Sequence, residues 1–134
     1  MPRHSPNQSL ADALERIERA RGIVECHGFD AVEQDYVLTD ALLHNLLIAS
    51  EALTRLNNEW PDRYADLEIR YPHVNWYAFR RFGDVLRHGY QIVDLAVVRR
   101  NLDDMIAAAE AAIRTELVLS TVSLTSPASR NADP

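Results

Sequence analysis

Apolar residues recur at intervals of three and four along most of the chain, and this spacing restricts the possible folds more than any other feature. It gives each helical segment one apolar stripe, which has to be buried against other helices. Four glycines in 134 residues are too few for the many turns of a sandwich or a barrel. The sequence therefore predicts a single all-α domain, an up-and-down antiparallel bundle of four main helices plus short helices.

The expected helix boundaries follow from this spacing together with capping residues and proline steps. Main helices are expected over residues 10–26, 36–58, 75–88 and 95–117, and short helices over residues 31–35 and 62–67. The expected N-caps, all short polar side chains that can accept hydrogen bonds from free helical N–H groups, are Ser9, Asp30, Asn75 and Asp94. The domain is expected to cover residues 9–119, between a flexible N-terminus (residues 1–8) and a disordered tail rich in Ser, Thr and Pro (residues 120–134).

The charge balance argues against several classes of protein. With 20 acidic against 14 basic residues the net charge is −6, which does not suit a broad basic surface for duplex nucleic acid. All basic residues are arginines, whose planar guanidinium suits phosphate or carboxylate.

No apolar run approaches the ~20 residues of a membrane span, and the polar N-terminus has no signal-peptide core. A single cysteine excludes an internal disulfide. We therefore expect a cytoplasmic protein.

One stretch, WYAFRRFGDVLRHGY at residues 76–90, concentrates the groups that can carry chemistry. Arg81 and His88 are two helical turns apart, so they project from nearly the same side at a backbone separation of about 10 Å, with Asp84 between them. Arginine holds phosphate and stabilises charge on its oxygens, and histidine transfers protons near neutral pH. Together they suit cleavage of RNA, whose own 2′-hydroxyl is the nucleophile, so no metal ion is required. A two-fold related copy of the helix would complete the groove, which predicts a homodimer.

Other polar and aromatic residues have structural interpretations beside the functional ones. His88 can equally be a helix-end residue, and the arginines of its segment can be solvated. A metal site could begin with Cys26, His27 and His44, but no second matching pair of ligands follows, so no metal site is expected. The aromatic residues that could stack on bases, and for which core or interface packing is favoured, are Trp60, Tyr64, Tyr71 and Trp76.

The order of these segments resembles the HepT-like branch of the HEPN helical domains, over residues 8–117. The matching blocks, in order, are LADALERIERA, DALLHNLLIASEAL, RYPHVNWYAFR, RRFGDVLRHGY and VDLAVVRRNLDDM. The family motif is an arginine, four to six residues, a histidine, any residue and a tyrosine; Arg81, His88 and Tyr90 fit it with six intervening residues. The resemblance implies a homodimeric, metal-independent endoribonuclease without a cofactor, the toxin of a type VII-like toxin–antitoxin pair.

The resemblance also implies a role for each residue of the motif. Arg81 would bind phosphate and act in catalysis, His88 would be the catalytic imidazole, and Asp84 would be the polar residue inside the motif. The implied partner is a minimal nucleotidyltransferase (MNT-type) antitoxin, encoded beside the toxin. By position, Tyr90 would accept AMP from this antitoxin, which silences the toxin.

The chain departs from the family pattern at one position of the motif. Many members have an arginine where this chain has Gly83, so Arg81 or Arg80 is expected to serve, with Arg87 as a further phosphate-binding group. The same departure leaves a second function open. In that alternative the domain is a non-catalytic binding partner and substrate of the nucleotidyltransferase.

Overall fold

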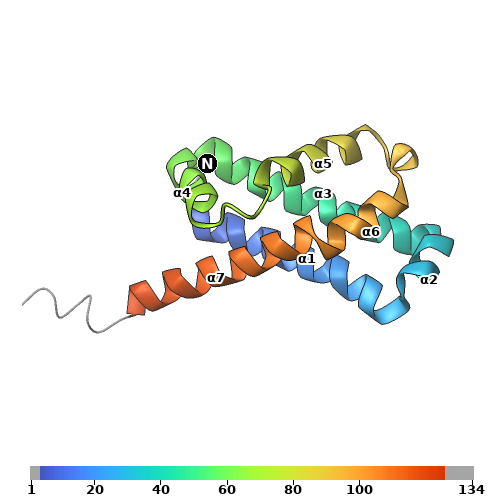
Figure 1. The fold of residues 1–134 in the computed structure, drawn as a ribbon, viewed down its shortest axis with the longest axis horizontal. Coiled ribbons are helices and arrows are strands. Elements are labelled where there is room, and N and C mark those ends of the chain that lie inside the picture. The colour runs from blue at the N-terminus through green and yellow to red at the C-terminus, as the bar shows by residue number, and fades with distance from the viewer. Residues whose placement is uncertain (1–3, 126–134) are drawn as a thin grey trace, which may run out of the picture.

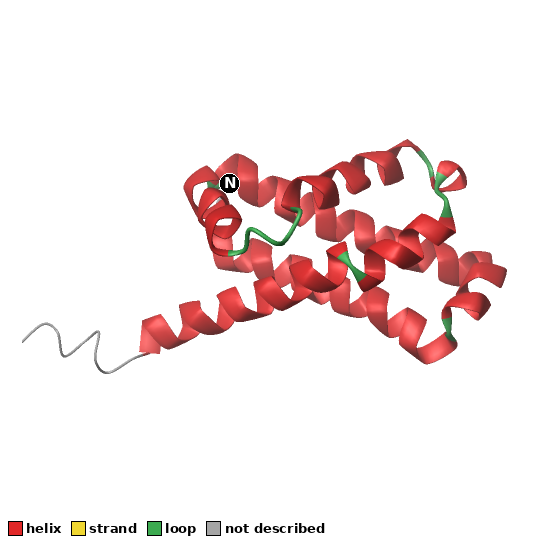
Figure 2. Cartoon of the chain, in the orientation of Figure 1, coloured by secondary structure: helices red, strands yellow, loops and turns green. Residues whose placement is uncertain are grey.

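The computed structural model describes residues 4–125, which form helices and connecting loops and contain no strand (Figure 2). In chain order the elements are α1 (Pro6–His27), α2 (Phe29–Gln34), α3 (Tyr36–Glu59), α4 (Pro61–Arg70), α5 (Trp76–His88), the 3-10 helix η1 (Tyr90–Ile92), α6 (Leu95–Asp103) and α7 (Met105–Thr125). The predicted all-α fold is confirmed. No helix within the described residues has the length and apolar character needed to cross a membrane.

The long helices alternate in direction along the bundle (Figure 1). α1 and α3 lie side by side, α5 packs against α3, and α6 followed by α7 returns along the bundle, with α7 against α1. The short helices α2 and α4 lie at opposite ends, and η1 connects α5 to α6. Successive helices are neighbours in space, so the connections stay short, as in an up-and-down bundle.

The first helix begins at Pro6, earlier than predicted, because its N-cap is Ser5 and not Ser9. The Ser5 hydroxyl accepts a hydrogen bond at 3.0 Å from the N–H three residues on, and Pro6 occupies the first turn. Ser9 is buried, where its hydroxyl accepts a hydrogen bond from Arg55 at 3.3 Å, and Asp12 pairs with the same guanidinium at 3.1 Å. Ser9, the predicted cap, and Asp12 therefore connect α1 to α3, and the N-terminus predicted to be flexible is helical from Pro6.

The other predicted caps have a mixed outcome. Asn75 and Asp94 cap α5 and α6 as predicted, each accepting a backbone hydrogen bond at 2.9 Å. Asp30 does not cap the first short helix: α2 begins at Phe29, with Gly28 in the N-cap position at a φ of 81°. Gly28 also ends α1, because its positive φ turns the chain directly from one helix into the next.

The single helix predicted over residues 95–117 is interrupted at Asp104, whose φ and ψ of −110° and −84° depart from helical values. Arg21 of α1 donates a hydrogen bond at 3.0 Å to the carbonyl oxygen of Leu102 and pairs with Glu110 at 3.0 Å. A side chain from another helix thus satisfies a backbone acceptor beside the break. The apolar spacing continues through this point, so periodicity alone did not reveal the interruption.

α7 also continues to Thr125, well past the predicted end at residue 117. The predicted tail therefore starts too early, because helical hydrogen bonding propagates through the Ser- and Thr-containing segment. Within it, the Thr121 hydroxyl donates to the Leu117 carbonyl at 3.0 Å. The rest of the predicted tail, residues 126–134, lies outside the described residues.

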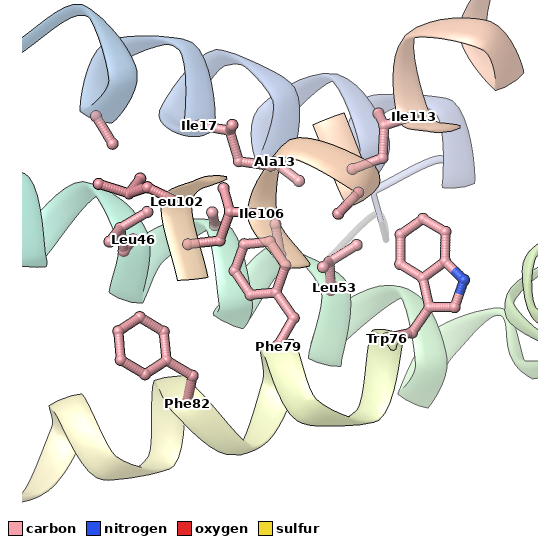
Figure 3. Packing of buried hydrophobic residues seen from close by; sticks show 14 of the residues in the cluster. Ala13, Ile17, Leu46, Leu53, Trp76, Phe79, Phe82, Leu102, Ile106 and Ile113 are labelled. Atoms are coloured by element: carbon pink, nitrogen blue, oxygen red, sulfur yellow. The ribbon is translucent and has the colours of Figure 1, made fainter. Parts of the chain in front are cut away.

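The core is formed by the apolar stripes of the long helices (Figure 3). Fully buried members include Leu10, Ala13 and Ile17 of α1, Leu46 and Leu53 of α3, and Ile106 and Ile113 of α7. From α5, Trp76, Phe79 and Phe82 project toward these helices. Close-packed rings of this size fix the rotation of α5 about its own axis, so its opposite side faces solvent.

α5 comes unusually close to α3 at Gly83. A Cβ atom added at Gly83 would lie 1.8 Å from the Ser50 Oγ and 2.5 Å from the Ser50 Cβ. Ser50 is fully buried, and its hydroxyl donates to the Leu47 carbonyl at 2.7 Å, so it has little room to move. Glycine at position 83 is therefore a packing requirement, because this position lies against α3 and does not face solvent.

A buried carboxylate on α7 joins three separate parts of the chain. Glu116 accepts hydrogen bonds from Arg63 (3.3 Å) and Arg70 (3.1 Å) of α4 and from the Tyr71 hydroxyl (3.1 Å). Arg63 also donates to Asn7 at the start of α1. Burial by itself raises the pKa of Glu116, but these hydrogen bonds and the arginine charges outweigh it and hold the pKa below its ordinary value.

We expect Glu116→Gln to lower the free energy of unfolding by about 2 kcal/mol at pH 7, because it removes a buried carboxylate that pairs with the part-buried Arg63 and with Arg70. A carboxyl group with a lowered pKa in the folded state stabilises above its unfolded pKa and loses this effect as the pH falls through the folded value. The difference between wild type and variant should therefore shrink in acid. Urea unfolding at pH 7 and at pH 3–4 measures both effects. Glu15→Gln, at an exposed ion pair with Arg19, is the control and should change stability by less than about 0.5 kcal/mol. A pH-independent difference would contradict this account.

Gly83→Ala should destabilise the protein by about 1–3 kcal/mol through overpacking against Ser50, although alanine is normally the better helix former. Thermal and urea unfolding measure the loss. Gly22→Ala is the matched control: it is also helical but has no atom within 4 Å of an added Cβ, so it should be neutral or stabilising. The double variant Gly83→Ala/Ser50→Gly should recover stability relative to Gly83→Ala alone. Equal stability of Gly83→Ala and Gly22→Ala would show that the contact is unimportant.

Candidate functional site

The two sides of α5 differ sharply in character. The buried side consists of Trp76, Phe79, Phe82, Gly83 and Leu86. The opposite side, which we call the outer stripe of α5, consists of the exposed residues Tyr77, Arg81, Asp84, Val85 and His88. Gly89 ends the helix at a φ of 137°, a backbone conformation that favours glycine. The apolar spacing of the segment thus decides which of its charged residues reach solvent.

Most of the predicted site residues come together at one groove. Arg81, Asp84, Val85, Arg87 and His88 line this surface groove, which has a volume of about 490 Å³. Its lining contains two arginines against one aspartate, on a chain with a net charge of −6. Such a groove can hold an anion without requiring a basic protein overall.

Arg87 is held by two carboxylates at the edge of the groove. It pairs with Asp84 one turn earlier at 2.5 Å and with Glu51 of α3 at 3.3 Å. Asp84, predicted to lie between Arg81 and His88, lines the groove with both, and its carboxylate accepts a hydrogen bond from Arg87. Two negative partners neutralise the charge of Arg87, and the three side chains together connect the outer stripe of α5 to α3.

Arg81 differs from almost every other arginine in the molecule. Among residues 4–125, only Arg81 and Arg100 have guanidinium groups without a hydrogen bond or ion pair to the protein, and Arg100 lies on α6. The imidazole of His88 likewise has no such partner within this part of the chain. The groove therefore presents one cation and one proton-transfer group, both with free hydrogen-bonding capacity.

Arg80 is directed away from the groove, toward α4. Its Nε donates to the Tyr64 hydroxyl at 2.8 Å, and its guanidinium lies over the Tyr64 ring at 5.1 Å and over the Tyr77 ring at 5.6 Å. Tyr64 is buried, so this hydrogen bond also satisfies a polar group inside the fold. The structure thus separates Arg80 from Arg81, although the two are adjacent in sequence.

Tyr90 lies beyond the end of α5, in η1, and is partly buried against the core. Burial raises the pKa of its phenol above the ordinary value, and the nearby carboxylates Asp40 and Glu51 raise it further. The phenol is therefore fully protonated at neutral pH. Glu51 contributes to this effect as well as pairing with Arg87, so Tyr90 and the groove share one neighbour on α3.

The remaining candidates from the sequence are accounted for by structure. Tyr64 and Trp76 are buried, the Trp60 Nε1 donates to the His4 carbonyl at 2.8 Å, and Tyr71 donates to Glu116, as favoured for these aromatic residues. In residues 4–125 there is no group of three or more His, Cys, Asp or Glu side chains placed to hold a metal ion.

Two residues that bear on the site, Glu51 and Tyr77, were not identified from the sequence. Glu51 belongs to α3, far from the motif in sequence, and nothing local in the chain relates it to Arg87. Tyr77 is 59% exposed, whereas Trp76 and Phe79, the aromatic residues before and after it in α5, are buried. Its position on the outer stripe was available from helical spacing, because it lies four residues before Arg81.

The fold and the groove define a class of protein: an all-helical bundle that displays an arginine and a histidine together on the outer side of one helix. Residues 13–116 match the family model described as Ribonuclease HepT-like, and the chain belongs to this family of the HEPN superfamily. The groove-lining residues and Tyr90 all fall within the matched range. No curated protein and no solved structure matches the chain significantly.

Proposed function

We propose that the protein is a metal-independent endoribonuclease, the toxin of a type VII-like HEPN/MNT toxin–antitoxin pair, with Arg81 and His88 as its catalytic residues. The observation that carries the proposal is that one groove presents a guanidinium and an imidazole that have no partner among residues 4–125. Membership of the HepT-like ribonuclease family supports RNA as the substrate.

In the proposed reaction the scissile phosphate of RNA lies on Arg81, which binds its non-bridging oxygens and stabilises the negative charge that grows on them. His88 accepts the proton of the 2′-hydroxyl. The 2′-oxygen then attacks the adjacent phosphorus, and a new 2′-O–P bond forms as the P–O5′ bond breaks. The products are a 2′,3′-cyclic phosphate and, after a proton returns to the leaving oxygen, a 5′-hydroxyl. Both the nucleophile and the phosphate belong to the substrate, so the residues need only orient, stabilise charge and move protons.

Among the arginines of α5, the contacts favour Arg81 for phosphate binding. Arg87 is neutralised by Asp84 and Glu51, and Arg80 is bonded to Tyr64 on the side of α4. Gly83 lies against α3, where no side chain fits. Arg81 alone in this helix combines exposure to the groove with an unpaired charge. Asp84 and Arg87 then act in support, as a fixed ion pair that shapes the edge of the groove.

A homodimer is part of the proposal. One chain supplies a single wall of an open groove, and Val85, 42% exposed, leaves apolar surface among the charges. A second copy facing the outer stripe of α5 would bury this surface and close the groove around the substrate.

The antitoxin is proposed to be a minimal nucleotidyltransferase that transfers AMP from ATP to Tyr90. The phenol oxygen attacks the α-phosphorus, the bond between the α-phosphorus and its bridging oxygen breaks, and pyrophosphate leaves. The raised pKa of Tyr90 means that its proton has to be taken by a base, which the partner enzyme would supply. Tyr90 follows the groove residue His88 by two positions, and this placement supports Tyr90 as the acceptor.

Arg81→Ala and His88→Ala should each lower RNA cleavage by about 100-fold or more, because each removes a group that acts in the transition state. Cleavage of a fluorescent single-stranded RNA measures the rate, and circular dichroism with thermal melting verifies the fold. Arg100→Ala is the matched control, since it removes the other unpartnered arginine, and should leave the rate within about twofold. Full activity of a pure His88→Ala preparation would refute the catalytic assignment. A wild type that is inactive yet modified at Tyr90 would instead indicate the non-catalytic partner.

Co-expression with the neighbouring nucleotidyltransferase should yield a protein with two copies of this chain and one AMP on each Tyr90. Native mass spectrometry reports the copy number, and peptide mass spectrometry locates the modification. Tyr90→Phe should abolish the modification, because it removes the attacking oxygen, whereas the control Tyr36→Phe, at an exposed tyrosine of α3, should retain it. A monomeric complex or AMP at another residue would contradict the assignment.

A further inference from the structure

We propose that Tyr77 is a stacking platform for the nucleobase that flanks the scissile phosphate. This inference rests on the proposed ribonuclease function and assigns the residue that positions the RNA strand along α5. Aromatic rings recognise single-stranded RNA by stacking on unpaired bases, a contact available to any base.

The first observation is the place of Tyr77 on the outer stripe. It precedes Arg81 by one helical turn, about 6 Å along the axis, and precedes His88 by about three turns, so all three side chains leave the same side of α5. One turn is close to the length of one nucleotide step in an extended strand. A phosphate on Arg81 thus brings a flanking base within reach of Tyr77.

The second observation is that the ring of Tyr77 is held by one cation–π contact and is otherwise largely exposed. The Arg80 guanidinium lies 5.6 Å from its centroid, and Arg80 is itself fixed by its hydrogen bond to the buried Tyr64. Tyr77 is 59% exposed, so much of its ring surface is accessible to a base. A ring held by a cation–π contact loses little freedom when a base stacks on its free face.

The third observation is selectivity among the aromatic residues. Trp76 precedes Tyr77 in the sequence, and Tyr64 contacts the same arginine, Arg80. Both are buried and present no free ring face. The other tyrosine with high exposure, Tyr36 at 79%, begins α3, about 21 Å along that helix from the contact between Ser50 and Gly83. Among residues 4–125, Tyr77 is therefore the exposed aromatic residue on the outer stripe of α5.

The test measures binding of a short fluorescein-labelled single-stranded 2′-O-methyl RNA by fluorescence anisotropy at fixed salt. This RNA lacks the attacking 2′-hydroxyl, so wild-type protein binds it without cleaving it. Tyr77→Ala should weaken binding roughly 5- to 100-fold. Tyr77→Phe keeps the ring and should stay within about twofold, whereas Tyr77→Leu keeps only apolar surface and should bind weakly. The control Tyr36→Ala should bind as wild type. Thermal melting verifies that each exposed-site variant folds.

A series of the same RNA with one abasic nucleotide at successive positions identifies the contact directly. At the stacked position, removal of the base should weaken wild-type binding by about the same factor as Tyr77→Ala, and the two changes together should cost no more than either alone. Unchanged affinity of Tyr77→Ala would overturn the proposal. Equal loss for Tyr77→Ala on every abasic RNA would also overturn it, and would point to a protein–protein contact at Tyr77.

The outcome is separable from that of the proposed function. If Arg81→Ala and His88→Ala abolish cleavage while Tyr77→Ala binds and cleaves as wild type, only the stacking role fails. If the wild-type protein neither binds nor cleaves RNA, the ribonuclease proposal and the stacking role fail together.

Discussion

The contact of Gly83 with Ser50 is the constraint on which the rest of the site depends. With no side chain at position 83, α5 approaches α3 closely enough for its three aromatic rings to fill the core, and the rotation of α5 is fixed. Residues seven apart lie within about 20° of each other around a helix, whereas residues five apart lie about 140° apart. With this packing, position 81 falls on the same side as His88 and position 83 does not. An arginine at position 81 therefore lies on the side of His88, while glycine at position 83 preserves the packing against α3.

The sequence was sufficient for the fold class and for the order of the helices, because apolar spacing is a local property. It was also sufficient for the Asn75 and Asp94 caps and for the alignment of Arg81 with His88, which depend only on helical geometry. It failed where the decisive contact is distant in the chain. The pairing of Arg87 with Glu51 and the binding of α4 by Glu116 join residues of different helices, and no local pattern encodes them.

Contacts between distant residues also explain why the number of arginines in the sequence says little about function here. Nine of the twelve arginines in residues 4–125 contact another helix. Five of them bind carboxylates there: Arg21, Arg55, Arg63, Arg70 and Arg114. A planar fork with several donors suits such contacts, so arginine enrichment in this chain reflects internal pairing as much as ligand binding. The informative residue is the one left unpaired in a groove, and only the structure separates Arg81 from its neighbours.

Proximity of Tyr90 to the groove also gives the proposed silencing a physical basis. Gly89 turns the chain so that Tyr90 packs on the bundle, where burial and the nearby carboxylates Asp40 and Glu51 raise the pKa of its phenol. The tyrosine is therefore a poor nucleophile by itself, and its modification requires a partner that removes the proton. In the proposed silencing, the phosphodiester of an attached AMP would place a negative charge two residues from His88. That charge would compete with RNA phosphate for Arg81, so the modification would block the groove without any change of fold.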